Sequence, residues 1–409
     1  MNYRPLSLVI GLAIGCPTWV SADPIGERMA RMEAMMAEMQ KEMDVQKATI
    51  RQQATTIAEQ KAHLEGAPPR AEKLTEDIEA KQTADTEGKA PWYSTIEIAG
   101  VIEVEATHHA PYVGQSESDL ALATFELGIA AQITDWLKVE ASLLYEEDDT
   151  PLEVDVASVT FANPEQSPWF VTAGQIYVPF GAYETNMVSD PLTLEVGETR
   201  ETALQAGFVK GDFNGSLYVF NGDNEKDGKS QIGAWGAALG FTREWEGGEV
   251  AAGIGYLSDL GDSDTLQGVI NDNQGNNDTD LIPAWTVSAK GRFGRFTLIG
   301  EYLAATESFE VTAVPWRSSG ARPSAWNLEV GYAFELFDKP STFAVGYQGA
   351  REALALELPK QRLVTAWSTE IYDHTKLSFE WAHDEDYSTN DGGTGKNADT
   401  LTAQLAVDF

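Results

Sequence analysis

Acidic side chains recur at alternate positions in the segment STIEIAGVIEVEAT, residues 94–107. Glu97, Glu103 and Glu105 share one phase, and the other phase is mostly isoleucine and valine. Successive residues of a β-strand point to opposite faces, so we predict that these carboxylates line one side of a strand. Carboxylates that face an aqueous pore favour cations and disfavour anions. Further glutamates lie on the polar phases of later segments. The candidates for residues that line the lumen are therefore Glu97, Glu103, Glu105, Glu126, Glu140 and Glu329.

Motifs for catalysis or metal binding are weak. The sequence contains no local Ser/His/Asp nucleophile motif and no Gly-rich phosphate loop. His108 and His109 are adjacent, so an extended chain points them in different directions, and we interpret them as solvated residues. The aspartates of residues 261–280 do not have the spacing of a calcium loop. We predict no enzyme, no metal site and no cofactor; an enzyme assembled only by the fold is a minor alternative.

The charge of the chain is strongly acidic. Residues 91–409 contain 17 Lys and Arg against 50 Asp and Glu, a net charge of −33. Because this negative charge repels phosphate groups, we do not expect the chain to bind nucleic acid. Aromatic residues make up 10% of the chain, which is typical of a folded protein rather than of an acidic disordered one.

The N-terminal residues 1–22 have the pattern of a secretory signal peptide. Arg4 precedes an apolar run, and the small-residue site Val20-Ser21-Ala22 follows it. Cys16, the only cysteine, lies in this segment, so we expect no disulfide. A lipoprotein acylated at Cys16 is a less favoured alternative.

Residues 23–65 repeat with the alternating spacings of four and three that are typical of a heptad. The seam runs from Ile25 to Leu64 and consists largely of Met, Ile and Gln. We predict an α-helical coiled coil in the periplasm, preferably a trimer, with a dimer or a solvated leader as alternatives. Residues 66–90 are predicted to be a linker.

After residue 91 the period changes to two, and we predict sixteen antiparallel strands in 91–409. Short turns alternate with mostly longer polar loops, as in outer-membrane β-barrels. An all-β transmembrane barrel pairs every backbone group within a closed wall, and a soluble sandwich is the alternative. Its lumen should be polar, wet and acidic. The strands are predicted to begin near residues 94, 119, 136, 152, 168, 201, 213, 231, 246, 281, 295, 325, 341, 361, 375 and 400.

The last segment, LTAQLAVDF, alternates with an apolar phase that ends on Phe409. We predict that this strand closes the barrel against the first strand, with Phe409 on the lipid side. Such an aromatic end resembles the signal that the barrel-assembly machinery recognises. Tryptophans near strand ends fit interfacial girdles: Trp136, Trp169, Trp235, Trp245, Trp285, Trp316, Trp326 and Trp381.

The segment GQIYVPFGAYETNMVSDPLTLEVGETRE, residues 174–201, contains the most distinctive loop. A strand runs into Pro179, and about twenty loop residues follow; loops of this length are usually functional. As the third external loop, it is predicted to fold inward and narrow a pore, with an ordinary surface loop as the alternative. The pore-loop candidates are Pro179, Phe180, Gly181, Glu184, Asp190, Pro191, Glu195, Glu198 and Arg200.

The stretch YVPFGAYETNMVSDPLTLEVGET, together with the Met- and Gln-rich seam ahead of the barrel, resembles the LbtU-type siderophore porins. The resemblance implies passage of a ferric siderophore across the outer membrane without a TonB-dependent plug. We therefore expect a homotrimeric porin in the outer membrane of a Gram-negative bacterium, surrounded by lipid, with the coiled coil in the periplasm. The alternatives are a general cation-preferring or other substrate-selective porin, or a structural anchor with a periplasmic tether.

Overall fold

The computed structural model describes residues 96–147, 150–224, 232–275 and 279–409. The predicted signal peptide, coiled coil and linker lie outside these residues, as do residues 91–95 at the start of the predicted barrel. All of the described residues belong to one compact unit, which runs from Ala90 to Phe409.

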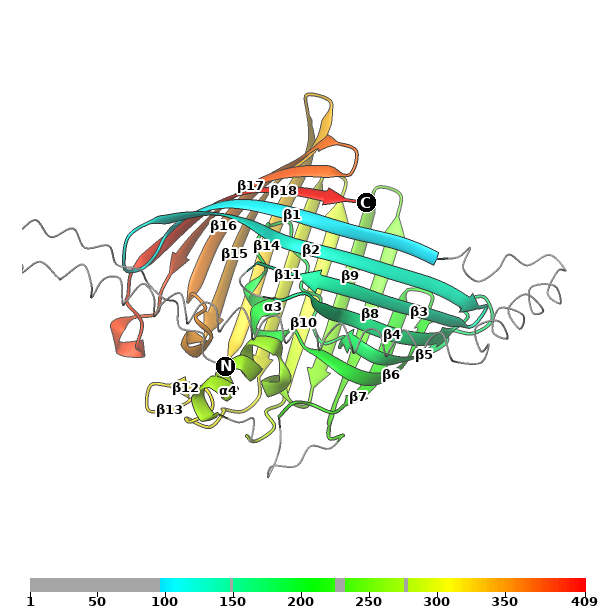
Figure 1. Cartoon of the computed structure of the whole chain (residues 1–409), viewed down its shortest axis with the longest axis horizontal. Coiled ribbons are helices and arrows are strands. Elements are labelled where there is room, and N and C mark those ends of the chain that lie inside the picture. Colours follow the sequence, from blue (N-terminus) through cyan, green and yellow to red (C-terminus); the bar gives the residue numbers. More distant parts are fainter. Residues whose placement is uncertain (1–95, 148–149, 225–231, 276–278) are drawn as a thin grey trace, which may run out of the picture. The chain divides into compact units, whose positions relative to one another are not determined.

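Sixteen antiparallel strands form one closed barrel (Figure 1), which confirms the predicted all-β barrel. Each strand begins within three residues of its predicted start, because the period-two pattern and the turn residues mark the strand ends in the sequence. The strands are β1 (Ile96–Ala110), β2 (Glu117–Thr134), β3 (Leu137–Tyr145), β4 (Glu153–Ala162), β5 (Trp169–Tyr177), β6 (Arg200–Lys210), β7 (Phe213–Phe220), β8 (Ala234–Trp245), β9 (Gly248–Leu257), β10 (Ala284–Phe293), β11 (Phe296–Ala305), β14 (Ser324–Leu336), β15 (Lys339–Arg351), β16 (Gln361–Tyr372), β17 (Thr375–Glu385) and β18 (Asn397–Asp408).

The barrel closes between its first and last strands, as predicted. β18 pairs antiparallel with β1, from Val101↔Asp408 to Ala110↔Asp399. Phe409 continues the seam: its N–H donates to the Gly100 carbonyl at 3.0 Å, and the Gly100 N–H donates to the Phe409 carbonyl at 2.9 Å. A methyl group on Gly100 would lie 2.7 Å from the Phe409 ring, so glycine leaves room for that ring. Phe409 remains 55% exposed.

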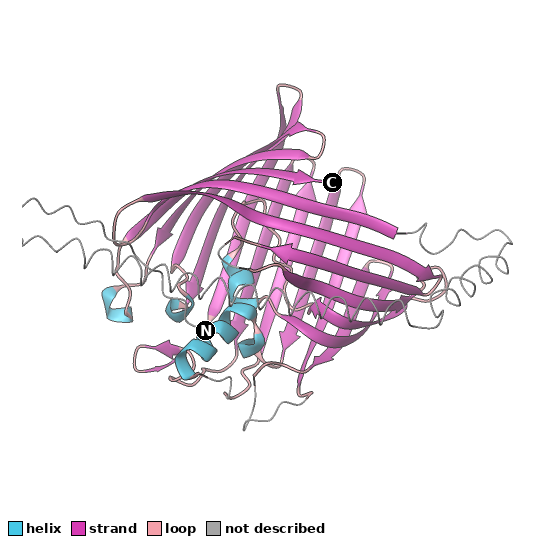
Figure 2. Cartoon of the chain, in the orientation of Figure 1, coloured by secondary structure: helices cyan, strands magenta, loops and turns pink. Residues whose placement is uncertain are grey.

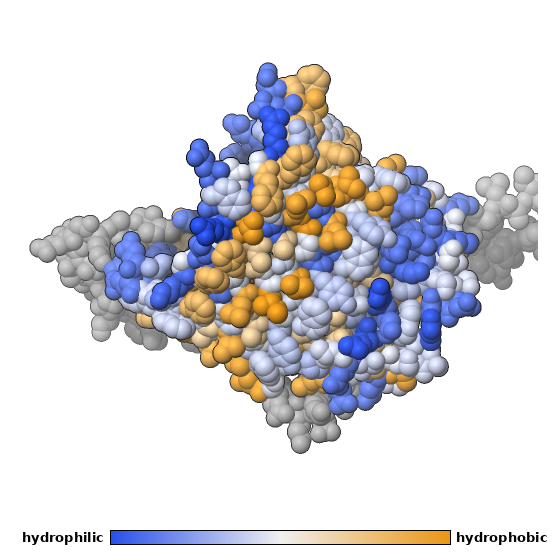
Figure 3. Space-filling model, turned by 180° about the vertical axis from the view of Figure 1, so that it is seen from behind, coloured by the Kyte–Doolittle hydropathy of each residue, from blue (hydrophilic) through white to orange (hydrophobic). Residues whose placement is uncertain are grey.

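The outer surface of the wall is apolar. The outward phases expose leucine, isoleucine and valine, among them Leu204, Leu217, Leu239, Ile254, Leu298 and Leu328. Figure 3 shows apolar side chains gathered over the wall on one face, with hydrophilic side chains mostly toward its margins. A surface of this kind is suited to hydrocarbon, where closed barrels satisfy all wall hydrogen bonds internally.

Aromatic rings pair across neighbouring strands toward both ends of this surface. Toward the long loops the pairs are Trp235–Tyr256, Trp285–Tyr302 and Trp326–Tyr347, and toward the short turns they include Trp136–Phe161, Trp169–Phe208 and Trp245–Phe293. The prediction was wrong for Trp316, which lies in an external loop. There it meets Tyr387 edge-on, because the loops pack on one another.

Short turns and long loops alternate around the barrel, and the long loops carry the remaining elements (Figure 2). No helix in the described ranges is long and apolar enough to cross a bilayer. In Figure 1 the C-terminus lies at the end of the barrel opposite to α4 and the β12–β13 hairpin. The loop elements are α3 (Leu192–Gly197), η2 (Leu260–Asp262), α4 (Asp264–Gln274), β12 (Pro315–Trp316), β13 (Ser319–Gly320), η3 (Leu354–Leu356) and η4 (Thr389–Asp391).

Candidate pore constriction

The loop between β5 and β6, residues 178–199 and here called the pore loop, lies along the inner wall of the barrel. Its backbone N–H groups donate to carboxylates on three distant strands. The Ala182 N–H donates to Glu301 on β11 at 2.7 Å, and the Asn186 N–H donates to Glu329 on β14 at 2.8 Å. The Val188 N–H donates to Glu380 on β17 at 2.5 Å. Hydrogen bonds to charged acceptors are among the stronger ones, so these anchors hold the loop firmly.

The anchors follow the order of the strands around the barrel. β10, β11 and β14 are successive neighbours in the wall, with β17 three strands further on. Along the pore loop, Ala182 meets β11 first, and Glu184 then forms an ion pair with Lys290 on the adjacent β10. The following residues reach β14 and then β17. The loop therefore leaves β5 and runs along the wall that lies across the lumen from it.

The returning half of the pore loop contains α3, which seals one side of the barrel mouth. Leu192 and Val196 of α3 are fully buried, and they belong to one apolar cluster with Leu266 and Ile270 of α4. Inward-facing residues of β6–β11, such as Phe220, Leu257 and Leu303, complete the cluster. The expectation of a polar, wet lumen is therefore wrong for this side, because the inner wall here packs against helices rather than against water.

The open carboxylates lie on the other side, near the tip of the pore loop. The Asp190 side chain is open to solvent, but much of the protein surrounds it. This enclosure, together with Glu146, Glu103 and Glu380, raises the pKa of its carboxyl. Burial, then Asp264 and Asp190, raise the pKa of Glu198, which follows α3, to about 7. Like charges held this closely form a strongly negative region.

The arginines beside this region are already paired. Arg200 forms ion pairs with Glu153 at 2.6 Å and Asp155 at 3.2 Å. Arg362 forms a bidentate pair with Asp384, at 2.7 and 2.9 Å. Their positive charges are therefore neutralised locally and leave the acidic character of the constriction unchanged.

The predicted pore-loop residues have unlike surroundings. Phe180 and Pro191 are buried, and Phe180 belongs to the apolar cluster. Glu184 is paired with Lys290, while Asp190 remains open. Pro179, Gly181, Glu195, Glu198 and Arg200 are half-buried or buried.

The lumen-lining candidates also divide. Glu329 is only 3% exposed and accepts hydrogen bonds from the pore loop, so it is an anchor rather than a free pore charge. Glu140 is bonded to Lys138. Glu103 and Glu105 are near Asp190 and Glu380, whereas Glu126 is near Asp155 and Glu97 lies toward the short-turn end of β1.

Sequence reasoning missed two of the three anchors. Glu380 lies in a clean polar phase of β17 that starts at Lys376, so the alternation could have identified it. Glu301 has Ile299 and Leu303 on its own face, and no alternation marks it as inward. Neither pattern could indicate that the partners are loop N–H groups more than a hundred residues away in sequence.

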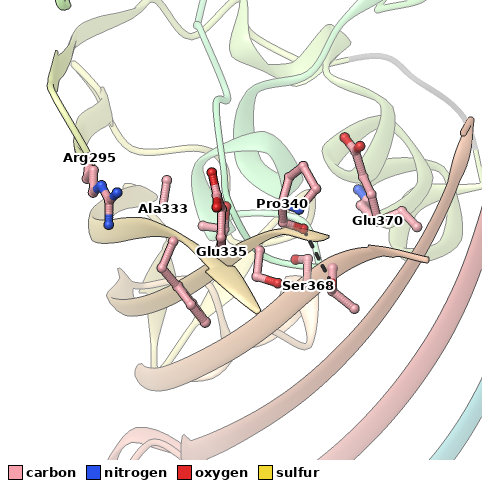
Figure 4. A pocket seen from close by; sticks show the side chains of 11 residues that line it. Arg295, Ala333, Glu335, Pro340, Ser368 and Glu370 are labelled. Carbon is pink, nitrogen blue, oxygen red and sulfur yellow. Dashed lines mark hydrogen bonds between the residues drawn. The ribbon is translucent and has the colours of Figure 1, made fainter. Parts of the chain in front are cut away.

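A separate hollow lies at the short-turn end of the inner wall (Figure 4). It is lined from β14, β15, β16 and β17, and Figure 4 places Glu335 and Glu370 on either side of Pro340. Arg295 and Lys376 also line it, so acids and bases are balanced there. This hollow therefore shows no acidic excess comparable to that at the tip of the pore loop.

No family model matches the chain. Its sequence is similar to a UPF0422 protein from Legionella pneumophila (strain Lens), with 30% identity over 355 residues covering 77% of this chain and 66% of the relative. A UPF0422 protein from Coxiella burnetii (strain RSA 493 / Nine Mile phase I) is 28% identical over 324 residues, covering 75% of this chain and 68% of the relative. The chain thus spans about two thirds of the length of these relatives.

Solved porin structures share the barrel. The anion-selective porin from Comamonas acidovorans matches with a TM-score of 0.54 and 11% identity, covering 77% of this chain and 99% of that chain. The outer membrane channel DcaP of Acinetobacter baumannii matches with a TM-score of 0.52 and 14% identity, covering 77% and 97%. The chain therefore has the closed sixteen-stranded barrel fold of porins, and its sequence is similar to that of the UPF0422 proteins.

Proposed function

We propose that the chain is an outer-membrane porin, a passive channel rather than an enzyme, with a preference for cations. The observation that carries this is the pore loop, which is anchored along the inner wall and presents Asp190 beside Glu103 and Glu380. The apolar cluster closes the side of β6–β11, so the conducting path runs between the loop tip and the acidic strands near the β1–β18 seam. Fixed acids along such a path favour cations.

The proposal is tested by planar-bilayer recording of the purified protein in a KCl gradient. We expect a steady single-channel current. Its reversal potential should lie closer to the equilibrium potential of K⁺ than to that of Cl⁻, because the acids attract K⁺ and repel Cl⁻. A reversal potential that favours chloride would contradict the acidic path. Absence of current would instead support the structural-anchor alternative.

We further propose that the solute is a ferric siderophore, in line with the LbtU-type resemblance. We also propose that the siderophore crosses the barrel passively, without a TonB-dependent energy supply. Because Arg200 and Arg362 are paired, a siderophore of neutral or positive charge fits the path better than an anionic polycarboxylate. Brief blocks of the KCl current by a ferric hydroxamate, and none by ferric citrate, are the expected result. Equal blocks by both, or by neither, would leave a general cation-preferring pore.

For the chain as a whole we propose a homotrimer, on the basis of the heptad seam of residues 25–64. Deletion of residues 23–90 should leave the single-channel current intact if the barrel is the functional part. Loss of function in cells with an unchanged current would favour a tether in the periplasm. Sedimentation of the full mature chain and of the deletion variant reports whether the seam sets the number of subunits.

Phe409 is proposed to be the residue that the barrel-assembly machinery reads. Substitution F409A keeps the backbone pairing with Gly100 and removes only the ring. We expect the amount of folded barrel in cells to fall severalfold, while refolding in detergent, followed by heat-dependent gel mobility, changes little. An equal loss in both settings would show that the ring acts by packing alone.

A further inference from the structure

Two buried aspartates meet under the external loops, away from the pore loop anchors. Asp259 follows β9, and its Oδ1 accepts hydrogen bonds from the N–H groups of Gly261 at 3.1 Å and Ile282 at 3.0 Å. Its Oδ2 accepts from the side-chain amide of Asn224, after β7, at 2.9 Å. Asp262 Oδ1 accepts from the Asn224 backbone N–H at 2.8 Å. The cluster thus joins three loop segments.

These carboxylates have no positively charged partner among the described residues. Asp259 is 0% exposed and Asp262 is 1% exposed, and neither forms an ion pair with a described Lys, Arg or His. Burial and the neighbouring Asp259 raise the pKa of Asp262 to about 8. Glu201 and Asp223 add further negative charge nearby. Two buried carboxylates are costly unless a cation or a shared proton compensates them.

Two oxygen atoms of the cluster are buried with no hydrogen-bond partner in the described part of the chain. They are Asp262 Oδ2 and Asn224 Oδ1, and Asn224 itself is only 8% exposed. Buried polar atoms are rarely left unpaired, so each needs an explanation. Both atoms are acceptors, and hydrogen bonds already orient the two side chains. Oxygen acceptors with excess negative charge are what a hard divalent cation requires.

We propose that Asp259, Asp262 and Asn224 bind one divalent cation of the size of Ca²⁺. The side-chain ligands would be two carboxylates and one amide, with water completing the shell. This set is distinct from a group of three or more His, Cys, Asp or Glu side chains, of which the described ranges contain none placed to hold a metal ion. The ligands come from two loops more than thirty residues apart. The spacing of a single calcium loop is therefore not expected, which explains why the sequence pattern did not predict the site.

The cation would fasten the external loops to the pore loop. Asp264, which begins α4 directly after the site, donates its N–H to the Glu198 carbonyl at 3.0 Å. Its carboxylate accepts from the Arg200 N–H at 3.3 Å. Ordering of residues 259–262 thus supports the returning half of the pore loop, although the site does not depend on what the pore conducts.

The test is calorimetric titration of CaCl₂ into the EDTA-treated full-length mature protein in detergent. We expect one saturable site with a Kd on the order of 10⁻⁴ to 10⁻³ M or tighter, as in extracellular calcium modules. Asp262→Asn should weaken binding at least tenfold. Asp272→Asn removes the same charge from an exposed position of α4 and should leave the isotherm unchanged.

Heat-dependent gel mobility reports whether each variant folds, and Asp259→Asn provides a second, independent loss of a ligand. No saturable binding to the unmodified protein would overturn the proposal in favour of a shared proton, as would identical isotherms for all variants. Because the readout is calcium binding, failure here is distinct from failure of the bilayer experiment.

Discussion

Simultaneous substitution of Glu301, Glu329 and Glu380 by alanine is expected to release the pore loop from the inner wall. Each bond from a backbone N–H to a carboxylate contributes about 1.5–3 kcal/mol, so the docked state loses several kcal/mol. In planar bilayers the triple variant should conduct more than the unmodified protein and should show much greater open-channel noise. Residues 178–191 should also become sensitive to limited proteolysis.

The matched control is Glu335→Ala, which removes a carboxylate from the same inner wall, on β14, where it lines the hollow at the short-turn end. It should leave conductance, noise and proteolysis unchanged. Glu380→Ala alone should have a smaller effect than the triple variant, because it frees only the contacts of Val188 and Ser189. If the triple variant has the conductance and the open-channel noise of the unmodified protein, α3 and the apolar cluster suffice to hold the pore loop.

Neutralising the acids near the loop tip, in the triple variant D190N/E103Q/E105Q, is expected to abolish most of the cation preference. A charge about 8 Å from the path interacts with an ion by about 0.5 kcal/mol in water, which is roughly a twofold effect per charge. Three such charges together favour K⁺ by nearly tenfold and disfavour Cl⁻ by the same factor, so their loss predicts a fall of roughly 60-fold in the ratio of K⁺ to Cl⁻ permeability. The reversal potential in a KCl gradient measures this ratio directly.

Glu97→Gln is the control for selectivity, because this acid lies on the same face of β1, about 20 Å from Glu103 at 3.3 Å per residue. It should shift the reversal potential far less than the triple variant does. If the two shifts are equal, the acids act through the overall charge of the barrel and not at the loop tip.

The constriction should also respond to pH. Enclosure raises the pKa of Asp190, and burial raises the pKa of Glu198 to about 7. Both groups become neutral as the pH falls through their raised pKa values, so fixed negative charge is lost. The pKa of Glu198 sets the window, and cation preference should decrease from about pH 8 to about pH 5. Ordinary carboxyls, with pKa values near 4, stay charged over most of this range. The substitution E198Q should reduce the change of cation preference with pH. If the pH profile of the variant matches that of the unmodified protein, other acids cause the pH dependence.

The wall of the barrel could be predicted from the sequence because its rules are local. Alternation with a period of two identifies each strand, and turns such as Gly211-Asp212 and Phe337-Asp338 mark their ends. Closure at Phe409 could be inferred from the apolar phase that continues to the last residue. The length of the pore loop identified it as distinctive, although length alone does not show where a loop lies.

Tertiary structure decided which carboxylates are open. Glu329 and Glu103 both lie on polar phases of strands. The Glu329 carboxylate accepts hydrogen bonds from the pore loop, whereas Glu103 lies near Asp190 and adds to the negative charge there. The difference depends on which part of a loop reaches each residue, and the partner of Glu329 is more than a hundred residues away in sequence. The same holds for Asp259 and Asp262, whose surroundings are assembled from the β7–β8 and β9–β10 loops. Local patterns thus determined the strands and their two faces. Long-range packing determined which of the inward-facing carboxylates are exposed to water.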